Sequence, residues 1–177
     1  MAHNVSLVWQ PKEAPPMNVD KNHAIIALVF ICGILAGGVL AGALQPRPVH
    51  SAKQTVHSEN APEPIGPYSQ AVQSGNFVFL SGQIGIDPAT GNLTGSSAGG
   101  QTAQAMENLQ AVLNASDLSL GDVVQTRIYF TNMSDWAAIN GIYASYFNNT
   151  YPARAAVQVA GLPKGAKVEI EMVAEAR

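Results

Sequence analysis

An arginine surrounded by small residues is the side chain in this sequence best suited to bind a substrate. Arg154 lies in the segment YPARAA, residues 151–156, with an alanine on each side. Small neighbours leave room for a ligand, and the planar guanidinium can donate two parallel hydrogen bonds to one carboxylate. This chemistry alone leaves two interpretations open. Arg154 either binds the carboxylate of a ligand or forms a surface ion pair with Glu169 or Glu171.

Glu169 and Glu171 are the acidic residues whose spacing comes closest to a catalytic pattern. They alternate with apolar residues near the C-terminus. In a strand, their side chains would share one face and lie ~6.5–7 Å apart. Two carboxylates at this spacing can act as an acid and a base, although a solvated strand face carries such a pair more often. Tyr68 and Ser81 each follow an apolar segment, and each alone indicates no more than a turn.

Histidine and cysteine are missing from the region that carries these residues. The sequence has four histidines, of which His57 is the last, and its single cysteine is Cys32. From residue 62 onward, the chain therefore offers no Ser-His-Asp triad, no cysteine nucleophile and no His-rich or Cys-rich metal site. We expect a site that uses neither a metal nor a cofactor.

Hydrophobic periodicity indicates which elements must position these side chains. Apolar residues recur at steps of three and four in two stretches, which predicts two amphipathic helices. Other stretches alternate or are rich in strand-forming residues, which predicts strands. The predicted helices cover residues 101–115 and 136–147, and the predicted strands cover residues 77–80, 123–130, 155–160 and 167–174. Two helices on one face of a mixed sheet give an α+β sandwich.

Residues 24–44 form an uncharged apolar run that is long enough to cross a membrane. A helix of about 21 residues spans roughly 30 Å, the thickness of the hydrocarbon core of a bilayer. A cleaved signal peptide is the alternative, with the small residues 41–43 as its cleavage site. However, a long mixed segment precedes the run, and the run exceeds the usual length of a signal-peptide core. We therefore predict a single-pass membrane helix.

The other segments complete a division of the chain into four parts. Residues 1–23 are predicted to be a disordered tail, residues 45–61 an extended proline-rich tether, and residues 62–177 a single domain. Lysines and arginines are balanced on the two sides of the apolar run. The sequence therefore leaves open on which side of the membrane the domain lies.

The predicted domain carries a net negative charge. Five basic and nine acidic residues follow residue 60, a balance of −4. A surface of this sign repels phosphate backbones, so the composition argues against nucleic acid as a partner.

Several separated motifs of the domain resemble the RidA/YjgF family of imine and enamine deaminases. The motifs follow the order of the family and cover essentially all of residues 62–176. They are PIGPYSQA at residues 64–71, GN through SGQI at 75–84, QAMENL at 104–109, and the segment from PAR at 152–154 to VEIEM at 168–172.

The resemblance implies a fold, an assembly and a site. The family fold is a chorismate-mutase-like α+β sandwich that forms homotrimers with active sites in the clefts between subunits. Arg154 matches the arginine that binds the substrate carboxylate, and Glu169 matches the acid that orients or activates water. Further positions match residues at the same cleft: Tyr68, Ser81, Gly82 and Asn140. The family often has cysteine where this chain has Ala156, so no thiol is available there.

The activity implied by the resemblance is hydrolysis of 2-imino or 2-enamino acids to 2-oxo acids and ammonium, without a cofactor. An imine carbon is already electrophilic, so a carboxylate clamp, one ordered water and one acid–base group suffice. A membrane anchor is unusual for this family of soluble trimers. It raises the alternative of a non-catalytic ligand-binding or accessory subunit of a membrane complex. Retention of Arg154 and Glu169 together with Tyr68 and Ser81 favours the enzyme.

Overall fold

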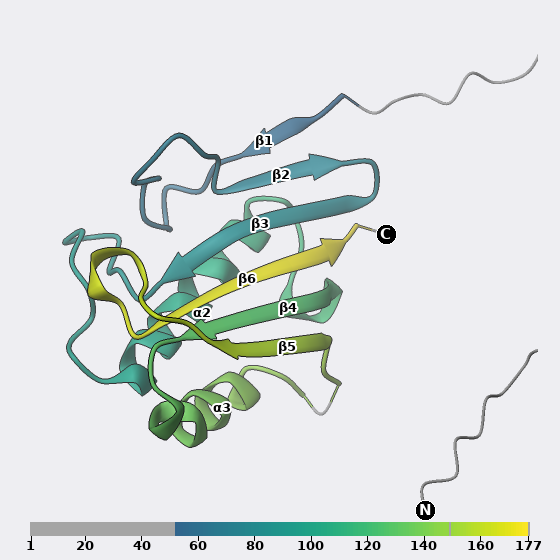
Figure 1. Cartoon of the computed structure of the whole chain (residues 1–177). Helices are drawn as coiled ribbons and strands as arrows, with labels where there is room; N and C mark the ends of the chain where they lie inside the picture. The colour runs from purple at the N-terminus through teal and green to yellow at the C-terminus, as the bar shows by residue number, and fades with distance from the viewer. Residues whose placement is uncertain (1–51, 149, 177) are drawn as a thin grey trace, which may run out of the picture. The chain divides into compact units, whose positions relative to one another are not determined.

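The computed structural model describes residues 52–148 and 150–176, which belong to one folded unit (Figure 1). The predicted tail and the predicted membrane helix, residues 1–23 and 24–44, lie outside the described residues. Within the described ranges, no helix has the length and apolar character needed to cross a membrane.

Six strands form one mixed sheet, in the spatial order β1-β2-β3-β6-β4-β5. Every neighbouring pair is antiparallel except β4 and β5, which run parallel. A parallel pair needs a crossover connection, and here the connection contains a helix. The strands span β1 (Gln54–Val56), β2 (Ala71–Ser74), β3 (Phe77–Ile84), β4 (Val123–Phe130), β5 (Ala153–Gln158) and β6 (Val168–Glu175).

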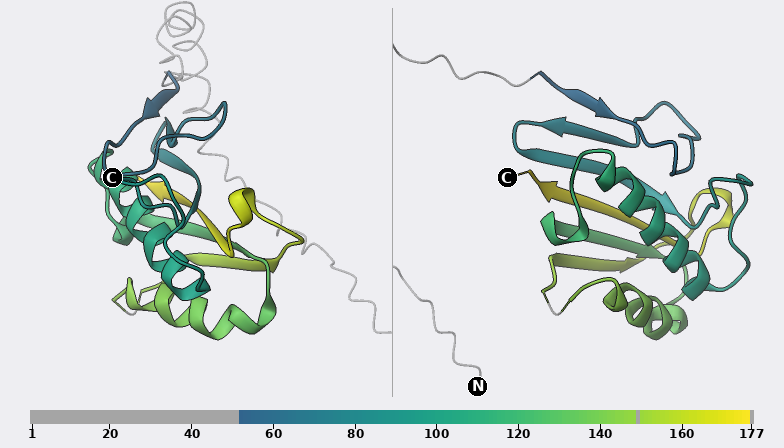
Figure 2. Two further views of the ribbon diagram at one scale, coloured as in Figure 1. Left: turned by 90° about the vertical axis from the view of Figure 1, so that its left-hand side faces the viewer. Right: turned by 180° about the vertical axis from the view of Figure 1, so that it is seen from behind.

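Two helices, α2 (Ala98–Asn114) and α3 (Trp136–Ser145), cover the same face of the sheet (Figures 1 and 2). Helix α2 lies over β3 and β6 and packs against α3. Its first turn is capped by the side chain of Ser97, which accepts a hydrogen bond from the Gly100 N–H. The predicted α+β class, with two helices on one face of a mixed sheet, is confirmed.

The hydrophobic core fills the space between the helices and the sheet. Side chains along a strand point alternately to its two faces. In β6, Val168, Ile170 and Met172 are buried under the helices, whereas Glu169 and Glu171 point to the open face. The helix-covered face is therefore apolar and closed, and the open face carries the charged residues of this strand.

Strand β3 is irregular at the point where candidate site residues lie. Between residues 80 and 83, β3 advances by three positions while its partner β6 advances by only two. The extra residue is a β-bulge at Ser81 and Gly82. A bulge changes the direction of the side chains around it, and this one is followed by two buried residues in succession, Gln83 and Ile84.

The folded unit begins before residue 62, the boundary expected from the sequence. Strand β1 pairs with β2, and the segment after β1 is held by the buried side chain of Gln70. Its Oε1 accepts a hydrogen bond from the Ser58 N–H at 2.6 Å, and its Nε2 donates to the Pro62 carbonyl at 3.0 Å. The later part of the expected tether is therefore part of the domain.

Several element ends differ from the sequence-based expectation by a few residues. Strand β5 begins and ends two residues earlier than expected, because its small exposed residues show little periodicity. Helix α2 begins at Ala98, directly after its Ser97 cap and before the apolar repeat starts, and α3 ends at Ser145. Short 3₁₀ turns occupy three connections: η2 (Leu120–Asp122), η3 (Met133–Asp135) and η4 (Pro163–Gly165).

Replacing Gln70 by alanine is expected to lower the free energy of unfolding by about 2–4 kcal/mol. The substitution leaves the buried Ser58 N–H without its acceptor and the Pro62 carbonyl without its donor. Urea denaturation followed by circular dichroism measures the change. Gln110→Ala removes the same side chain from an exposed position of α2 and serves as the control. Equal midpoints for the two variants would contradict the prediction.

Candidate active site

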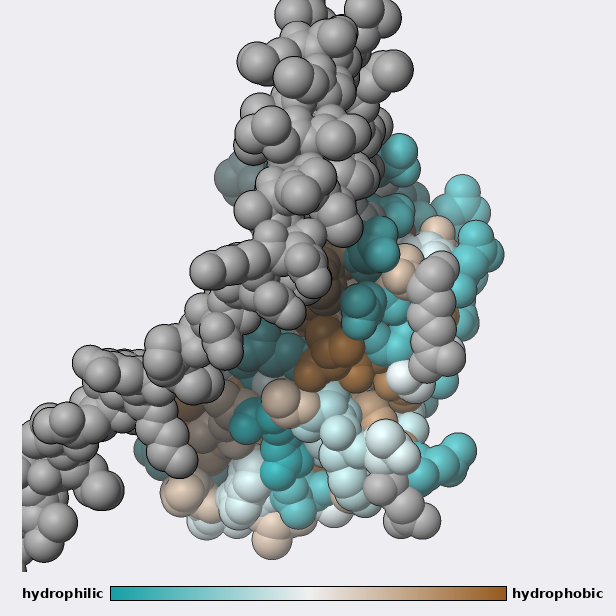
Figure 3. All heavy atoms as spheres, turned by 90° about the vertical axis from the view of Figure 1, so that its right-hand side faces the viewer, coloured by the Kyte–Doolittle hydropathy of each residue, from teal (hydrophilic) through white to brown (hydrophobic). Residues whose placement is uncertain are grey.

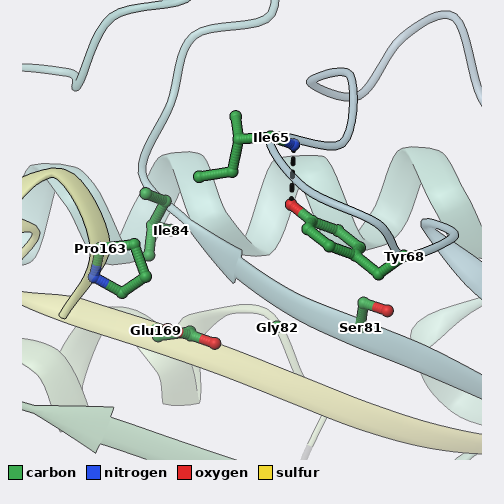
Figure 4. A pocket seen from close by; sticks show the side chains of 7 residues that line it. All are labelled: Ile65, Tyr68, Ser81, Gly82, Ile84, Pro163 and Glu169. Carbon is green, nitrogen blue, oxygen red and sulfur yellow. Dashed lines mark hydrogen bonds between the residues drawn. The ribbon is translucent and has the colours of Figure 1, made fainter.

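A cavity of about 200 Å³ opens beside the bulge of β3 (Figure 4). Four of the predicted site residues line it: Tyr68, Ser81, Gly82 and Glu169. Three apolar residues complete the lining: Ile65, Ile84 and Pro163. Figure 4 shows Tyr68 and Ser81 on one side, the apolar side chains on the other, and Glu169 on the strand below them.

Gly82 makes the space that the Glu169 carboxyl occupies. A Cβ atom at position 82 would lie 2.0 Å from Oε1 of Glu169 and 2.8 Å from its Cδ. Both distances are far below van der Waals contact, so any side chain at position 82 would displace the carboxyl group. The resemblance assigned Gly82 to the cleft, and the structure adds a physical reason for glycine there, because a larger residue would move the Glu169 carboxyl from its present position.

The electrostatic surroundings of Glu169 favour its protonated form. Burial raises the pKa of the Glu169 carboxyl, and the negative charge of Glu171 on the same face raises it further. Glu171 itself forms an ion pair with Arg127 of β4, and this hydrogen bond raises the pKa of Arg127. A partly buried carboxyl group with a raised pKa can both give and accept a proton, as general acid–base chemistry requires.

Tyr68 and Ser81 are held in place by hydrogen bonds to the backbone of the loop that covers the cavity. The Tyr68 hydroxyl accepts a hydrogen bond from the Ile65 N–H at 3.2 Å, so residues 65–68 close into a compact turn. The Ser81 hydroxyl donates to the Ser69 carbonyl at 2.7 Å. These contacts join the loop to the bulge of β3 and leave both hydroxyls at the cavity.

Arg154 and Asn140 line a different cavity of about 430 Å³, between α3 and the start of β5. Asn140 Oδ1 accepts a hydrogen bond from Arg154 Nη2 at 2.9 Å. The guanidinium carbon lies 4.8 Å from the ring centroid of Tyr143 and 5.2 Å from that of Trp136. Cation–π contacts of this kind orient a guanidinium without neutralising it. Among the described residues, no carboxylate forms an ion pair with Arg154.

Arg154 and Glu169 lie on opposite faces of the sheet. Arg154 is level with Thr126 of β4, and Thr126 is buried beneath the helices, where it accepts a hydrogen bond from Tyr143. Glu169 points to the open face of β6. Within one copy of the chain, the two predicted catalytic residues are therefore not brought together. The surface ion pair considered for Arg154 is also not formed, because Glu169 and Glu171 both point to the open face, where Glu171 pairs with Arg127.

Neither of the two cavities holds a cluster of potential metal ligands among the described residues. In residues 52–148 and 150–176, no group of three or more His, Cys, Asp or Glu side chains is placed to hold a metal ion. His57 belongs to the folded unit, which corrects the expectation that every histidine lies outside the domain. Its Nε2 lies 2.9 Å from Glu63 Oε1, and both side chains are exposed.

Some residues of the two cavities were not anticipated from the sequence. Tyr143 and Trp136 were assigned only to the apolar stripe of a helix, yet they pack against the Arg154 guanidinium. Ile84 and Pro163 carry no recognisable chemical pattern. A buried amide on α2, Asn108, was also missed. It donates to the carbonyls of Ile84 and Ile86 at the end of β3 and so holds the cavity wall against the helix.

Comparison with known proteins assigns the family. The family model described as Endoribonuclease L-PSP matches residues 58–176. A RutC family protein of Pyrococcus horikoshii is 48% identical over 122 residues, which cover 69% of this chain and 97% of that protein. The chain belongs to the RidA/YjgF/RutC family. Another member, the 2-iminobutanoate/2-iminopropanoate deaminase of Mus musculus, is 42% identical over 122 residues, 69% of this chain and 90% of that protein.

Solved structures of RidA/YjgF/RutC proteins share the fold. RidA of an Antarctic Psychrobacter is 45% identical, with a TM-score of 0.67, and the match covers 69% of this chain and 98% of that chain. E. coli TdcF, solved with bound serine, is 39% identical with a TM-score of 0.68, over 70% of this chain and 99% of that chain. The six-stranded sheet with two helices is therefore the RidA-type fold.

Replacing Glu169 by glutamine is expected to stabilise the domain at alkaline pH. Because the folded-state pKa of Glu169 is raised, the folded protein binds this proton more tightly than the unfolded chain does. The stability of the wild type therefore falls as the pH rises from the unfolded pKa through the folded pKa. Glutamine carries no charge, so the melting temperature of Glu169→Gln should exceed that of the wild type by about 1–3 °C at pH 8.

Differential scanning fluorimetry between pH 4 and pH 8 measures this difference, which should disappear towards pH 4 because both side chains are then neutral. Glu175→Gln, at the exposed end of the same strand, is the control. A difference between Glu169→Gln and the wild type that does not change with pH would contradict the assignment of a raised pKa.

Proposed function

We propose that this chain hydrolyses reactive 2-imino acids, and the enamines in equilibrium with them, to 2-oxo acids and ammonium. The observation that carries the proposal is an arginine held in place by an amide and two aromatic rings, with no carboxylate partner in the described structure. A guanidinium in this state is prepared for an anionic ligand. Relatives named 2-iminobutanoate/2-iminopropanoate deaminase, such as the one from Mus musculus, support the choice of ligand.

The reaction needs one bound substrate, one water molecule and one proton-transfer group. In the proposed complex, Arg154 holds the carboxylate and so orients the adjacent imine carbon. Glu169 accepts a proton from the attacking water and returns it to the nitrogen, which gives a carbinolamine. The same carboxyl group then passes the hydroxyl proton of the carbinolamine to the nitrogen, which leaves as ammonia while the carbonyl group forms. The carbon–oxygen bond forms, the carbon–nitrogen bond breaks, and no electron leaves the system. The raised pKa of Glu169 suits a group that must both accept and donate.

Both residues can act on one substrate only if two copies of the chain meet. The cavity at Arg154 lies on the helix side of the sheet edge, and the cavity at Glu169 lies on the open face. A cyclic assembly places different faces of neighbouring copies against each other. We therefore propose that the site forms between subunits, with Arg154 and Asn140 from one copy and Tyr68, Ser81, Gly82 and Glu169 from its neighbour.

The open face of the sheet has the composition expected of an interface. Phe79 of β3 and Val157 of β5 are about half exposed on this face. Figure 3 views the end of the sheet where the C-terminus lies, and it shows further apolar surface bordered by polar residues at that end. Exposed apolar surface of this kind often marks a contact with another protein. The exposed apolar residues on this face support the homotrimer proposed from the family resemblance, in which a neighbouring copy would cover them.

RNA cleavage, the activity in the description of the matching family model, has less physical support in this chain. The domain sequence has a net charge of −4, whereas binding to phosphate backbones is favoured by a positive surface. His57, the histidine among the described residues, is engaged with Glu63 at an exposed position. Neither cavity combines a basic residue with an acid–base residue: the cavity at Glu169 has no lysine or arginine in its lining, and the cavity at Arg154 has no acidic residue or histidine.

Substitution of Arg154 is expected to remove the activity while the fold remains. Arg154→Ala should lower kcat/KM for 2-iminopropanoate by about 100-fold or more, because two charge-assisted hydrogen bonds are lost. Arg154→Lys keeps the positive charge but lacks the planar guanidinium, and its kcat/KM should lie between those of the wild type and Arg154→Ala. The imine is produced in situ from L-alanine by an amino-acid oxidase, and release of the 2-oxo acid is followed. Wild-type activity in Arg154→Ala would remove Arg154 from the site.

A mixing experiment tests whether the site is shared between copies. Arg154→Ala and Glu169→Gln should each be inactive alone, and co-expression at equal amounts should restore about one quarter of the wild-type activity in mixed cyclic assemblies. One site in four then receives an intact Arg154 from one copy and an intact Glu169 from its neighbour. Light scattering checks that assemblies form. Assemblies without any recovered activity would contradict a shared site.

A further inference from the structure

We propose that the apolar end of the Glu169 cavity receives the side chain of the imino acid and that Ile65 limits how long this side chain can be. The proposal rests on the proposed function, because it concerns the substrate of the same site. It gives Ile65 the role of a specificity-determining residue and gives Tyr68 the role of positioning it.

The cavity divides into a polar part and an apolar part (Figure 4). The polar part presents the hydroxyls of Tyr68 and Ser81 and the carboxyl group of Glu169. The apolar part is formed by Ile65, Ile84 and Pro163, and no charged or amide side chain lines it. A polar substrate side chain placed there would lose its water without gaining a hydrogen bond, which is unfavourable. Aliphatic side chains are therefore favoured over acidic or amide side chains.

The two isoleucines of the apolar part differ in how firmly they are held. Ile84 is 7% exposed and belongs to a small hydrophobic cluster with Ile86 and Ala166 at the end of β3. Ile65 is 51% exposed and lies in the loop that covers the cavity. The Ile84 side chain is thus fixed by packing, whereas the position of the Ile65 side chain depends on its own loop.

Ile65 is also the residue shared by two cavities. Behind the loop lies a second cavity of about 270 Å³, and its lining includes Ile65 together with Pro62, Pro64, Ile86, Pro88, Glu63, Gly91 and Lys164. Ile65 is the one residue common to the linings of both cavities. Shortening its side chain removes atoms from the surface that both cavities share, and the largely apolar space behind it becomes available to a longer substrate.

Tyr68 holds Ile65 in its position between the two cavities. Its hydroxyl accepts the hydrogen bond from the Ile65 N–H at 3.2 Å, and its own N–H donates to the Gly66 carbonyl at 2.8 Å. Removing the hydroxyl frees the Ile65 backbone while the Tyr68 ring remains in place. The effect of Tyr68→Phe should therefore resemble that of a shorter Ile65 side chain, with a smaller magnitude.

The test compares substrates of different side-chain length with the full-length protein. Imines of L-alanine, L-leucine, L-phenylalanine and L-glutamate are generated in situ by amino-acid oxidases or dehydrogenases, and kcat/KM is measured for each. The wild type should accept the alanine and leucine imines and discriminate against the other two. In Ile65→Ala, the ratio of kcat/KM for the phenylalanine imine to that for the alanine imine should rise roughly tenfold. The glutamate imine should remain a poor substrate.

Ile142→Ala, on α3, makes the same chemical change at a residue that lines neither cavity and should leave all ratios within about twofold of the wild type. Tyr68→Phe should shift the ratio in the same direction as Ile65→Ala. An unchanged ratio in an active Ile65→Ala enzyme, or a wild type that prefers the glutamate imine, would overturn this inference and leave the deaminase function standing. A wild type that accelerates the loss of no imine would overturn both.

Discussion

The alternation of side chains along a β-strand is the constraint on which the function of this domain depends. Arg154 is level with a buried residue of β4 and therefore points to the helix side of the sheet, whereas Glu169 occupies the other face of β6. No rotation of side chains can bring a guanidinium and a carboxyl group together through a closed sheet. The proposed reaction, which uses both groups, would therefore take place only where two copies of the chain meet, and activity would depend on association of the chain.

The surroundings of Glu169 accommodate its carboxyl group although they disfavour the charged form of that group. Strand β3 bulges at Ser81 and Gly82, shortly before its pairing with the glutamate, and the missing side chain of Gly82 leaves the space for the carboxyl group. Burial and the neighbouring Glu171 both disfavour the charged form. A residue placed only for stability would not be kept in such a position, because either the burial or the like charge could be avoided at an ordinary surface site. The arrangement is typical of a proton-transfer group, whose usefulness depends on the same factors that reduce stability.

The sequence allowed the fold class and the main elements to be predicted, because the helices and β6 have strong hydrophobic periods. The resemblance also identified six of the residues that line the two cavities. Their division between two faces was not foreseen, since it depends on the register of β4, β5 and β6, and register is a property of pairing rather than of any single segment. The aromatic rings around Arg154 were missed for a related reason, because a helical stripe does not reveal which of its residues reaches the sheet edge.

The domain boundary was misjudged because a short edge strand has almost no sequence signal, and this has a consequence for the site. Residues 54–61 look like a linker, with prolines and few large apolar groups nearby. In the structure, Gln70 binds their backbone, and the loop carrying Ile65 and Tyr68 continues directly from them. The wall of the Glu169 cavity is thus anchored through a segment that the sequence pattern assigns to the tether. A contact that displaced this segment would therefore also displace the loop that carries Ile65 and Tyr68, because the two are continuous in the chain.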